Sequence, residues 1–361
     1  MAWTPPPPRA GHPYYMYEAI QGQPAAIRSV LRRNREALKV VAAQLQHADQ
    51  VLLSGIGTSW HACLVGELLL SQIGGLGHRV RAFHSFELSN YWPEPHAKTG
   101  VIVISHRGTK RFSLEALQKA KAGGGFGVAI TGLGSGEGLH AADHLLRTVE
   151  QENSGAHTIS YTTALALLAA LAAELGGNGE FAAGLEAIPY LMEALLERES
   201  GEALATRFRN RRCYYFIGGG PNTSTACEAA LKMNEANYAI TVGMNCEQVL
   251  HGPWAALEPE DVVFLVAPPG PSYERCLAVA RVAGEVGAPV VGLLAEGDAE
   301  LASLCAPVVP LPPTPELLTP ILAVVPLQLL TYHLALLRGT NPDTMRAHEP
   351  AHGRARAGLS L

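Results

Sequence analysis

The sequence lacks the cysteine pattern of a protein stabilised by disulfides or zinc. Its 361 residues contain six cysteines, none spaced as Cys-x-x-Cys and none grouped with histidines at the spacing of a zinc site. We therefore expect buried free thiols in a reducing compartment, and neither a metal nor another cofactor. A chain of this length can bury a core that needs no such support.

A strong positive charge is also missing. The formal net charge is -5 and only 16% of the residues are charged, which argues against a nucleic-acid partner but leaves room for a local basic pocket. The first ten residues are rich in proline and have no apolar core, so they predict neither a signal peptide nor an anchor. The most apolar segment, 321–337, has the length of a buried helix. We expect a cytoplasmic protein without a membrane partner.

Short apolar runs alternate with amphipathic stretches along most of the chain. Residues 1–14 predict a flexible arm, because their four consecutive prolines cannot enter a helix interior. A long helix is expected over 15–48. Strands are expected at 50–54, 79–83, 101–105, 127–131 and 144–148, and again at 213–217, 262–267, 290–294 and 307–311. This alternation predicts parallel sheets with helices on both faces.

The two halves of the chain repeat one pattern. Residues 51–70 and 214–233 both read as a strand, a Gly-x-Gly turn, hydroxyl residues and a helix. A period of about 160 residues is too long for a solenoid and indicates a duplicated α/β domain. We predict a first domain over 15–200, a second over 201–340, and a C-terminal tail over 341–361.

Two loops follow predicted strands, where ligands of parallel sheets bind. In the first, Gly57 lets the backbone approach an anion, and Thr58 and Ser59 offer hydroxyl groups at the start of a helix. The second contains Ser105, Arg107, Gly108, Thr109 and Lys110. Cations on a loop are often merely solvated, but two such loops in one domain favour an anion site.

A predicted helix in the second domain carries three charged residues on one face, since Glu228, Lys232 and Glu235 are spaced by four and three positions. An exposed salt-bridged helix face would have the same spacing. His251 precedes a Gly-Pro turn, and a lone histidine is more often structural than catalytic.

Five segments in this order resemble the tandem SIS (sugar isomerase) domains of the isomerase half of glutamine:fructose-6-phosphate amidotransferase and of stand-alone phosphosugar isomerases and deaminases. They are GTSWHA (57–62), ISHRGT (104–109), ACEAALKMNEANY (226–238), EQVLHGP (247–253) and PLQLLTYHLALLRGTNPD (326–343). The resemblance covers residues from about 15 to 345. It implies an α/β fold of two SIS domains, each a doubly wound parallel five-stranded sheet flanked by helices, and a homodimer.

The resemblance also implies roles for individual residues. A sugar phosphate would be the ligand, held by Thr58 and Ser59 and by the loop of Ser105 and Thr109. Glu235 matches the base that moves a proton between sugar carbons C1 and C2, and Lys232 matches the lysine that supports it. His251 matches the ring-opening histidine, which reaches in from the partner subunit.

Several positions depart from the family pattern. The phosphate loop, Ser-Gln-Ser-Gly-Glu-Thr in the family, has Arg107 and Lys110 at its third and sixth positions, so the anion is held differently or carries more charge. His157 stands where a phosphate-site serine is expected. The tail contains no counterpart of the family's imine-forming lysine. His348 and His352 lie four residues apart, but Pro350 between them argues against a metal pair on one helix.

These features support an aldose–ketose isomerase acting on a hexose or hexosamine 6-phosphate, or an amino-sugar-phosphate deaminase. No glutaminase region precedes residue 15, so amide transfer from glutamine is not expected. A phosphosugar sensor that has lost the chemistry is the alternative. A nicotinamide-dependent oxidoreductase is disfavoured, because neither glycine-rich turn completes Gly-x-Gly-x-x-Gly.

Overall fold

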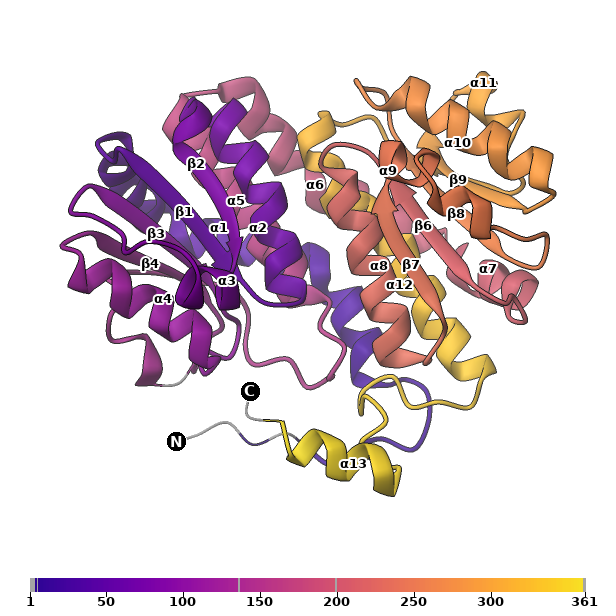
Figure 1. Ribbon diagram of the computed structural model, residues 1–361, viewed down its shortest axis with the longest axis horizontal. Coiled ribbons are helices and arrows are strands. Elements are labelled where there is room, and N and C mark those ends of the chain that lie inside the picture. Colours follow the sequence, from indigo (N-terminus) through magenta and orange to yellow (C-terminus); the bar gives the residue numbers. More distant parts are fainter. Residues whose placement is uncertain (1–3, 5, 136, 199, 360–361) are drawn as a thin grey trace.

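The chain folds into two α/β lobes that lie side by side (Figure 1). The computed structural model describes residue 4 and residues 6–135, 137–198 and 200–359. Each lobe has one five-stranded, fully parallel sheet with helices on both faces, as the sequence predicts.

The first lobe contains a sheet of order β2-β1-β3-β4-β5. Its strands are β1 (Gln50–Gly55), β2 (Val80–His84), β3 (Thr99–Ile104), β4 (Phe126–Thr131) and β5 (His144–Arg147). Its helices are α1 (Tyr15–Gln46), α2 (Thr58–Leu68), α3 (Ser85–Asn90), α4 (Arg111–Ala122), α5 (Ile159–Gly176) and α6 (Gly179–Glu197). Every residue of the central strand β3 is buried, which explains its unbroken apolar run.

The second lobe repeats this topology, with order β10-β9-β8-β6-β7. Its strands are β6 (Tyr214–Gly218), β7 (Thr241–Asn245), β8 (Val262–Ala267), β9 (Val290–Ala295) and β10 (Val308–Leu311). Its helices are α7 (Ser200–Phe208), α8 (Asn222–Ala236), α9 (Cys246–Leu250), α10 (Tyr273–Val286), α11 (Ala299–Ala302) and α12 (Thr319–Leu337). The sequence pattern missed β7, because an edge strand that is only half-buried needs no apolar run.

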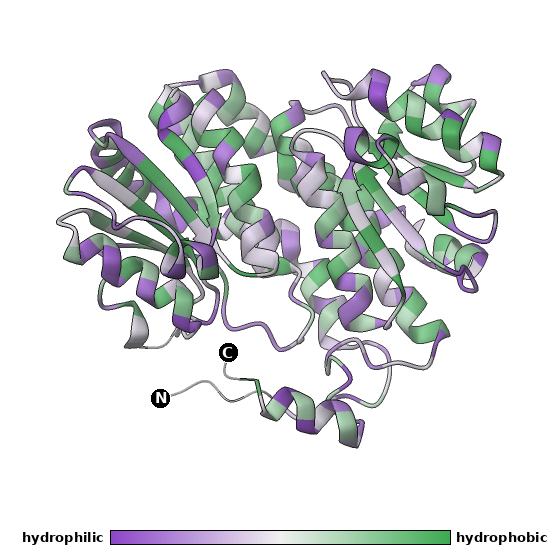
Figure 2. Ribbon diagram, in the orientation of Figure 1, coloured by the Kyte–Doolittle hydropathy of each residue, from purple (hydrophilic) through white to green (hydrophobic). Residues whose placement is uncertain are grey.

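Helix α12 joins the two lobes. Some of its side chains, such as Ile321 and Val325, pack in the core of the first lobe, and others, such as Leu327 and Leu334, pack in the core of the second. Both flanks of this helix are therefore apolar, and Figure 2 shows it as green along most of its length. By length and composition, α5 and the segment Glu316–Leu337 could each cross a membrane, but both are mostly buried within the molecule. The expectation of a buried helix over 321–337 is confirmed.

The described part of the N-terminal arm lies against α1, α12 and the tail. Arg9 pairs with Glu18 at 2.8 Å, and the ring of His12 is hydrogen-bonded to Tyr332 at 2.7 Å. The flexibility of 1–14 stays a prediction, and residues 1–3 and 5 lie outside the described part of the chain. The predicted boundary at 200/201 falls at the start of α7, whose buried side chains belong to the second core.

Candidate active site

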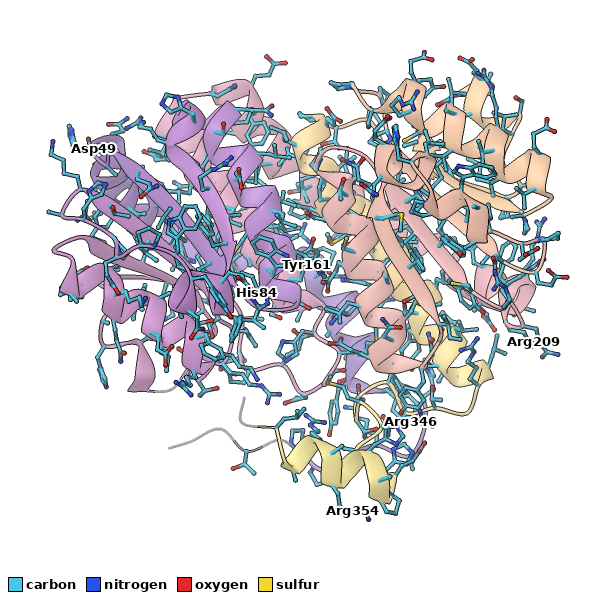
Figure 3. All side chains as sticks on the ribbon, in the orientation of Figure 1. Asp49, His84, Tyr161, Arg209, Arg346 and Arg354 are labelled. Atoms are coloured by element: carbon cyan, nitrogen blue, oxygen red, sulfur yellow. The ribbon has the colours of Figure 1, made fainter. Side chains whose placement is uncertain are left out.

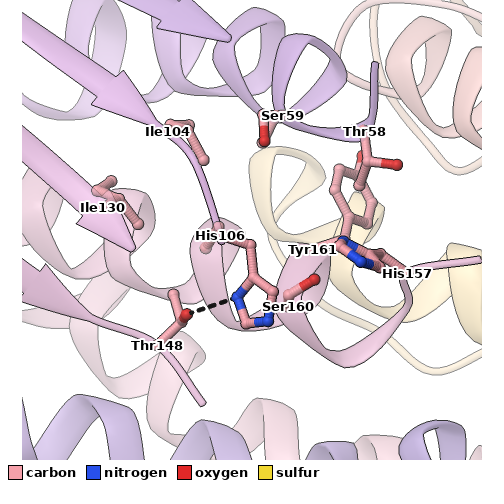
Figure 4. A pocket seen from close by; sticks show the side chains of 11 residues that line it. Thr58, Ser59, Ile104, His106, Ile130, Thr148, His157, Ser160 and Tyr161 are labelled. Carbon is pink, nitrogen blue, oxygen red and sulfur yellow. Dashed lines mark hydrogen bonds between the residues drawn. The ribbon is translucent and has the colours of Figure 1, made fainter. Parts of the chain in front are cut away.

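The sheet topology fixes where a ligand can bind in the first lobe. Neighbouring strands β1 and β3 have connections that leave in opposite directions, which opens a crevice at their carboxyl ends. A cavity lies there, between the start of α2, the loop after β3 and the start of α5 (Figure 4). Its polar lining comes from Thr58, Ser59, His106, Thr148, His157, Ser160 and Tyr161.

The loop between β1 and α2 is tight enough to need glycine. Gly57 has φ of 59°, and a Cβ atom on Gly55 would lie 2.5 Å from the backbone of Ser59. Helix α2 begins at Thr58, at the edge of the cavity, and the N–H groups of Ser59 and Trp60 in its first turn donate to the carbonyls of Ile56 and Gly57. Ser59 and Thr58 line the cavity, and the Thr58 hydroxyl donates to Glu228 Oε1 at 3.1 Å. Their binding of a phosphate group stays a prediction.

The loop between β3 and α4 surrounds a buried hydroxyl group. The backbone of Ser105 is fully bonded, since its N–H donates to Ile130 and its carbonyl accepts from Thr131. Its Oγ is buried and has no hydrogen-bond partner among the described residues. A donor or acceptor of this kind is costly to bury unless a ligand satisfies it. Of the other residues predicted in this loop, Gly108 has φ of 65° and Thr109 is exposed to solvent. Arg107 and Lys110 are half-buried.

His106, which the sequence reading left unassigned, is buried and neutral. Burial, followed by the neighbouring His157, lowers the pKa of His106 to about 4. Its Nε2 accepts the Glu152 backbone N–H at 3.1 Å, and its Nδ1 lies 3.4 Å from the Thr148 hydroxyl. Because Nε2 accepts a hydrogen bond, the proton of the neutral ring lies on Nδ1, and His106 lines the cavity as an uncharged side chain.

His157 lies in the cavity beside Tyr161 (Figure 4). Its ring meets that of His106 edge to face, with centroids 5.3 Å apart. Burial, then the charges of Lys232, Arg107 and Lys110, lowers the pKa of His157 to about 3. At neutral pH His157 therefore offers an uncharged ring to a ligand.

The loop that carries His157 is held from within by a buried carboxylate. Glu152 accepts from the Thr158 hydroxyl at 3.1 Å and from the Ser160 N–H at 3.1 Å, and it also bonds the Thr158 N–H. These amide groups are the free donors at the start of α5, so Glu152 caps that helix. The fold of this loop thus fixes the position of His157.

The second lobe contributes a charged cluster from α8, which packs against α2. Glu228 and Lys232 are almost completely buried, and the Glu235 side chain is only 16% exposed. The alternative of a solvent-exposed helix face is therefore wrong. Lys232 contacts Glu235 directly, and its Nζ lies 3.6 Å from Glu228 Oε1.

The two lobes are joined at this cluster by a chain of hydrogen bonds and ion pairs. Glu228 bonds the Thr58 hydroxyl through one oxygen and His61 Nδ1, at 2.6 Å, through the other. Thr58, Glu228, Lys232 and Glu235 are therefore linked in succession from the first loop to the predicted base. Glu235 is thus connected to the first loop through Lys232 and Glu228, and its role as the base stays a prediction.

The electrostatics of the pair suit proton transfer. Burial raises the pKa of Glu235 above its ordinary value, although Lys232 opposes the shift. Burial pulls the pKa of Lys232 down, but Glu235 and Glu228 outweigh it and the pKa ends above its ordinary value. The cluster thus combines a carboxylate whose proton affinity is increased with a fixed ammonium group beside it.

His251 does not join the site within its own chain. It follows α9, exposed to solvent, and its Nε2 lies 2.8 Å from Glu247, which also pairs with Arg275. Strands β6 and β7 are parallel neighbours, so α9 begins at the same sheet edge as α8. Glu235 lies at the far end of α8, and a 15-residue helix is about 20 Å long.

Four residues of the site were missed by the sequence reading or given no role there. His61, His106, Glu152 and Tyr161 all follow a predicted strand or precede a predicted helix, but nothing in the local pattern marks them. The Tyr161 hydroxyl is buried without a hydrogen-bond partner among the described residues, and burial and the charge of Glu228 raise its pKa well above the usual range.

The described residues contain no cluster of histidine, cysteine, aspartate and glutamate suited to a metal ion. His348 lies near Thr344, and His352 pairs with Glu349 at 3.2 Å. Pro350 begins helix α13 (Pro350–Ala357), so the two histidines stand on different segments.

Comparison with known proteins places this geometry in a family. Residues 44–174 and 207–338 each match the SIS domain family, one match for each lobe. The glutamine–fructose-6-phosphate aminotransferase (isomerizing) of Thermococcus kodakarensis is 33% identical over 351 residues, which cover 94% of this chain and 58% of that protein. The enzyme of that name from Pyrococcus horikoshii is 31% identical over 345 residues, with 94% and 57% covered. The chain therefore spans less than three-fifths of these relatives.

Solved structures show the same fold. The C-terminal domain of glucosamine-fructose-6-phosphate aminotransferase from Francisella tularensis has a TM-score of 0.84 and 20% identity, covering 92% of this chain and 98% of that one. Tagatose-6-phosphate ketose/aldose isomerase from Escherichia coli has a TM-score of 0.77 and 21% identity, covering 95% and 97%. Glucosamine-6-phosphate deaminase from Thermotoga maritima has a TM-score of 0.74 and 20% identity, covering 91% and 97%. Because both lobes match and a relative is 33% identical across 94% of this chain, this chain belongs to the SIS domain family.

Proposed function

We propose that this protein is an enzyme that interconverts the aldose and ketose forms of a hexose or hexosamine 6-phosphate. The observation that carries the proposal is the buried Lys232–Glu235 pair, which the second lobe holds beside the strand-end loops of the first. A pocket for an anion and a base with an increased pKa are the two parts that such a reaction needs.

The phosphate group is assigned to the first lobe. Ser59 at the start of α2 and Ser105 after β3 supply hydroxyl groups, and the Ser105 Oγ is buried without a hydrogen-bond partner among the described residues. Neutral His157 lies at the same cavity and supplies one more hydrogen-bonding group.

The proton transfer is assigned to Glu235. An ionised Glu235 takes the proton from the sugar carbon next to the carbonyl group and returns it to the other carbon. The charge that develops on the enediolate oxygen is stabilised by Lys232. The raised pKa of Glu235 favours this role, because a base is most effective when its pKa is near the working pH.

The ring-opening step is assigned to His251 of a second copy of the chain. Within one chain His251 is exposed and lies at the other end of α8 from Glu235. The exposed side chain of Trp254 follows it and offers apolar surface for a homodimer contact. The six free cysteines, five of them buried, suit the reducing cytoplasm as the location of this dimer.

The proposal extends to amino-sugar phosphates. Residues 341–361 contain no lysine, so no tail lysine is present to hold a ketose as an imine. Loss of ammonia from an amino-sugar phosphate needs ring opening and the transfer of a proton from C2 to C1, which His251 and Glu235 supply. Water then hydrolyses the resulting imine at C2, which releases ammonia and leaves the ketose. Deamination is therefore the form of the reaction to test first on glucosamine 6-phosphate.

A phosphosugar sensor is the second candidate, favoured by the two loop cations Arg107 and Lys110. The deciding assay offers fructose, glucose, glucosamine and N-acetylglucosamine 6-phosphates to the protein and follows aldose–ketose exchange and ammonia release. Wild-type protein should convert at least one of them. Binding without any product would instead favour the sensor.

The variant Glu235→Gln tests the assigned base. We expect it to lose turnover by at least about a thousandfold, since the base is removed, while calorimetry shows sugar-phosphate binding within about threefold of wild type. Glu285→Gln, on an exposed face of α10, is the matched control and should keep full activity. Turnover retained in Glu235→Gln would exclude Glu235 as the base.

A further inference from the structure

One buried carboxylate connects the first lobe with the charged cluster of α8. Glu228 is completely buried, and a carboxylate in that setting is stable only where donors satisfy its oxygens. Oε1 accepts the Thr58 hydroxyl at 3.1 Å, and Oε2 lies 2.6 Å from Nδ1 of His61. Both donors belong to α2, which faces α8 across the boundary between the lobes (Figure 1).

Thr58 and His61 reach Glu228 together because they lie three positions apart on α2, and so share one face of it. Only Thr58 of the two also lines the cavity of the first lobe. A hydroxyl group has a single proton, so a phosphate group bound in the cavity competes with Glu228 for the Thr58 bond. The bond from His61 is outside that competition.

The proton of the His61–Glu228 bond lies on the histidine. Glu228 faces the Lys232 ammonium at 3.6 Å and accepts the Thr58 hydroxyl, which is the setting of an ionised carboxylate. Such a group can only accept, so Nδ1 of His61 is the donor. The His61 side chain is 13% exposed, and its Nε2 makes no hydrogen bond with another described residue. One bond, directed at the second lobe, therefore holds this ring.

Tyr161 of α5 does not satisfy the same carboxylate. Burial, followed by the charge of Glu228, raises the pKa of Tyr161 well above the usual range. Its hydroxyl is nevertheless buried without a hydrogen-bond partner among the described residues. Figure 3 labels Tyr161 at the boundary between the lobes. When Thr58 bonds a ligand, His61 is therefore the donor from the described part of the first lobe that remains on Glu228.

The bonds to Glu228 decide where the Lys232 ammonium lies. Lys232 contacts Glu235 directly and lies 3.6 Å from Glu228 Oε1, so two carboxylates compete for one buried cation. Without donors from the first lobe, Glu228 would draw the ammonium away from Glu235, because an unsatisfied charge costs more at the fully buried site than at the partly exposed one.

We propose that His61 is a positioning residue of the reaction, which holds Glu228 through its Nδ1–H while the substrate occupies the Thr58 hydroxyl. Lys232 thereby stays on Glu235. The inference rests on the proposed function, which supplies the phosphate group at the cavity and the role of Glu235. It gives His61 a part in the reaction that needs no contact with the sugar, and it makes the boundary between the lobes part of the site.

The test compares His61→Leu with His61→Asn. Leucine removes the donor, whereas the asparagine side chain can place an N–H group where Nδ1–H lies. We expect His61→Leu to lower kcat by about tenfold to a hundredfold with KM within about threefold, because the base is misplaced and the cavity is not. His61→Asn should keep kcat within about threefold of wild type. His78→Leu, at an exposed histidine of the same lobe, is the matched control and should match wild type.

Equal losses of kcat in His61→Leu and His61→Asn would show that the hydrogen bond is not what matters. A folded His61→Leu with the kcat of wild type would show that the ring only fills space. Either result overturns the inference.

Magnetic resonance of protein with isotope-labelled histidine tests the bond without turnover. In wild-type protein at neutral pH, Nδ1 of His61 should carry a proton that exchanges slowly with water, because it is bonded to a buried carboxylate. The signal is assigned by its loss in His61→Asn. An Nδ1 without a proton would contradict the inference, whether or not His61→Leu folds.

The outcome is separable from that of the proposed function. If wild-type protein converts none of the sugar phosphates, the enzyme proposal fails, and a protonated Nδ1 still supports the bridge from His61 to Glu228. If it converts one of them and His61→Leu keeps its kcat, the positioning role fails alone. A lowered kcat with an unchanged KM in His61→Leu, restored in His61→Asn, supports both.

Discussion

The two histidines of the cavity should make the protein sensitive to mild acid. The pKa of His106 is lowered to about 4 and that of His157 to about 3, both mainly by burial. Each ring is neutral in the folded state at any pH well above these values, whereas in the unfolded chain each gains a proton near its ordinary pKa of 6.5. Stability is therefore full above pH 6.5 and is lost as the pH falls toward the folded-state pKa.

The size of the effect follows from proton linkage. Between about pH 7.5 and about pH 5.5, protonation of an unfolded histidine lowers the free energy of unfolding by about 1.4 kcal/mol if the folded ring stays neutral. For His106 and His157 together the loss is about 2.7 kcal/mol. The figure hardly depends on the folded pKa values, because both lie well below the lower pH of the comparison.

The assay is urea unfolding at the two pH values in a buffer free of phosphate. His157→Gln removes one titrating ring, so its loss of stability on acidification should be smaller than that of wild type by about 1.4 kcal/mol. His47→Gln removes an exposed ring outside the site and should match wild type. Equal losses in His157→Gln and wild type would show that His157 is protonated in the folded protein, which contradicts its lowered pKa.

Two further predictions concern the charged cluster of α8. Glu228→Gln should lower the free energy of unfolding by about 3 kcal/mol, because buried Lys232 loses one of its two carboxylate partners; urea unfolding measures this, and a loss below about 1 kcal/mol would contradict it. The kcat/KM of the wild-type enzyme should fall on acidification with a midpoint above pH 4.5, the ordinary glutamate value, because burial raises the pKa of Glu235 and the base must be ionised to act. A pH profile with its acid limb below that value would contradict the assignment.

Most strands could be predicted from the sequence because each buried strand leaves an apolar run in its own residues. Buried parallel strands require continuous apolar runs, and each predicted run became a strand, with ends displaced by one or two residues. The duplication could be predicted because both halves of the chain show apolar runs in the same order. Strand β7 could not be predicted, because its residues are held by pairing with β6 rather than by burial. Helix α13 has no buried face and left no periodic signal.

The sequence by itself determined the two α/β domains, the glycine turns and the hydroxyl residues that follow them, because backbone conformation and helix starts depend on neighbouring residues. Only the tertiary structure decided that Glu228 of α8 bonds Thr58 and His61 of the first lobe, that His106 and Glu152 shape the cavity, and that the tail returns to residue 155. These contacts join residues far apart in the chain. Their energies come from burial and charge in the assembled molecule, and no local pattern of residues records them.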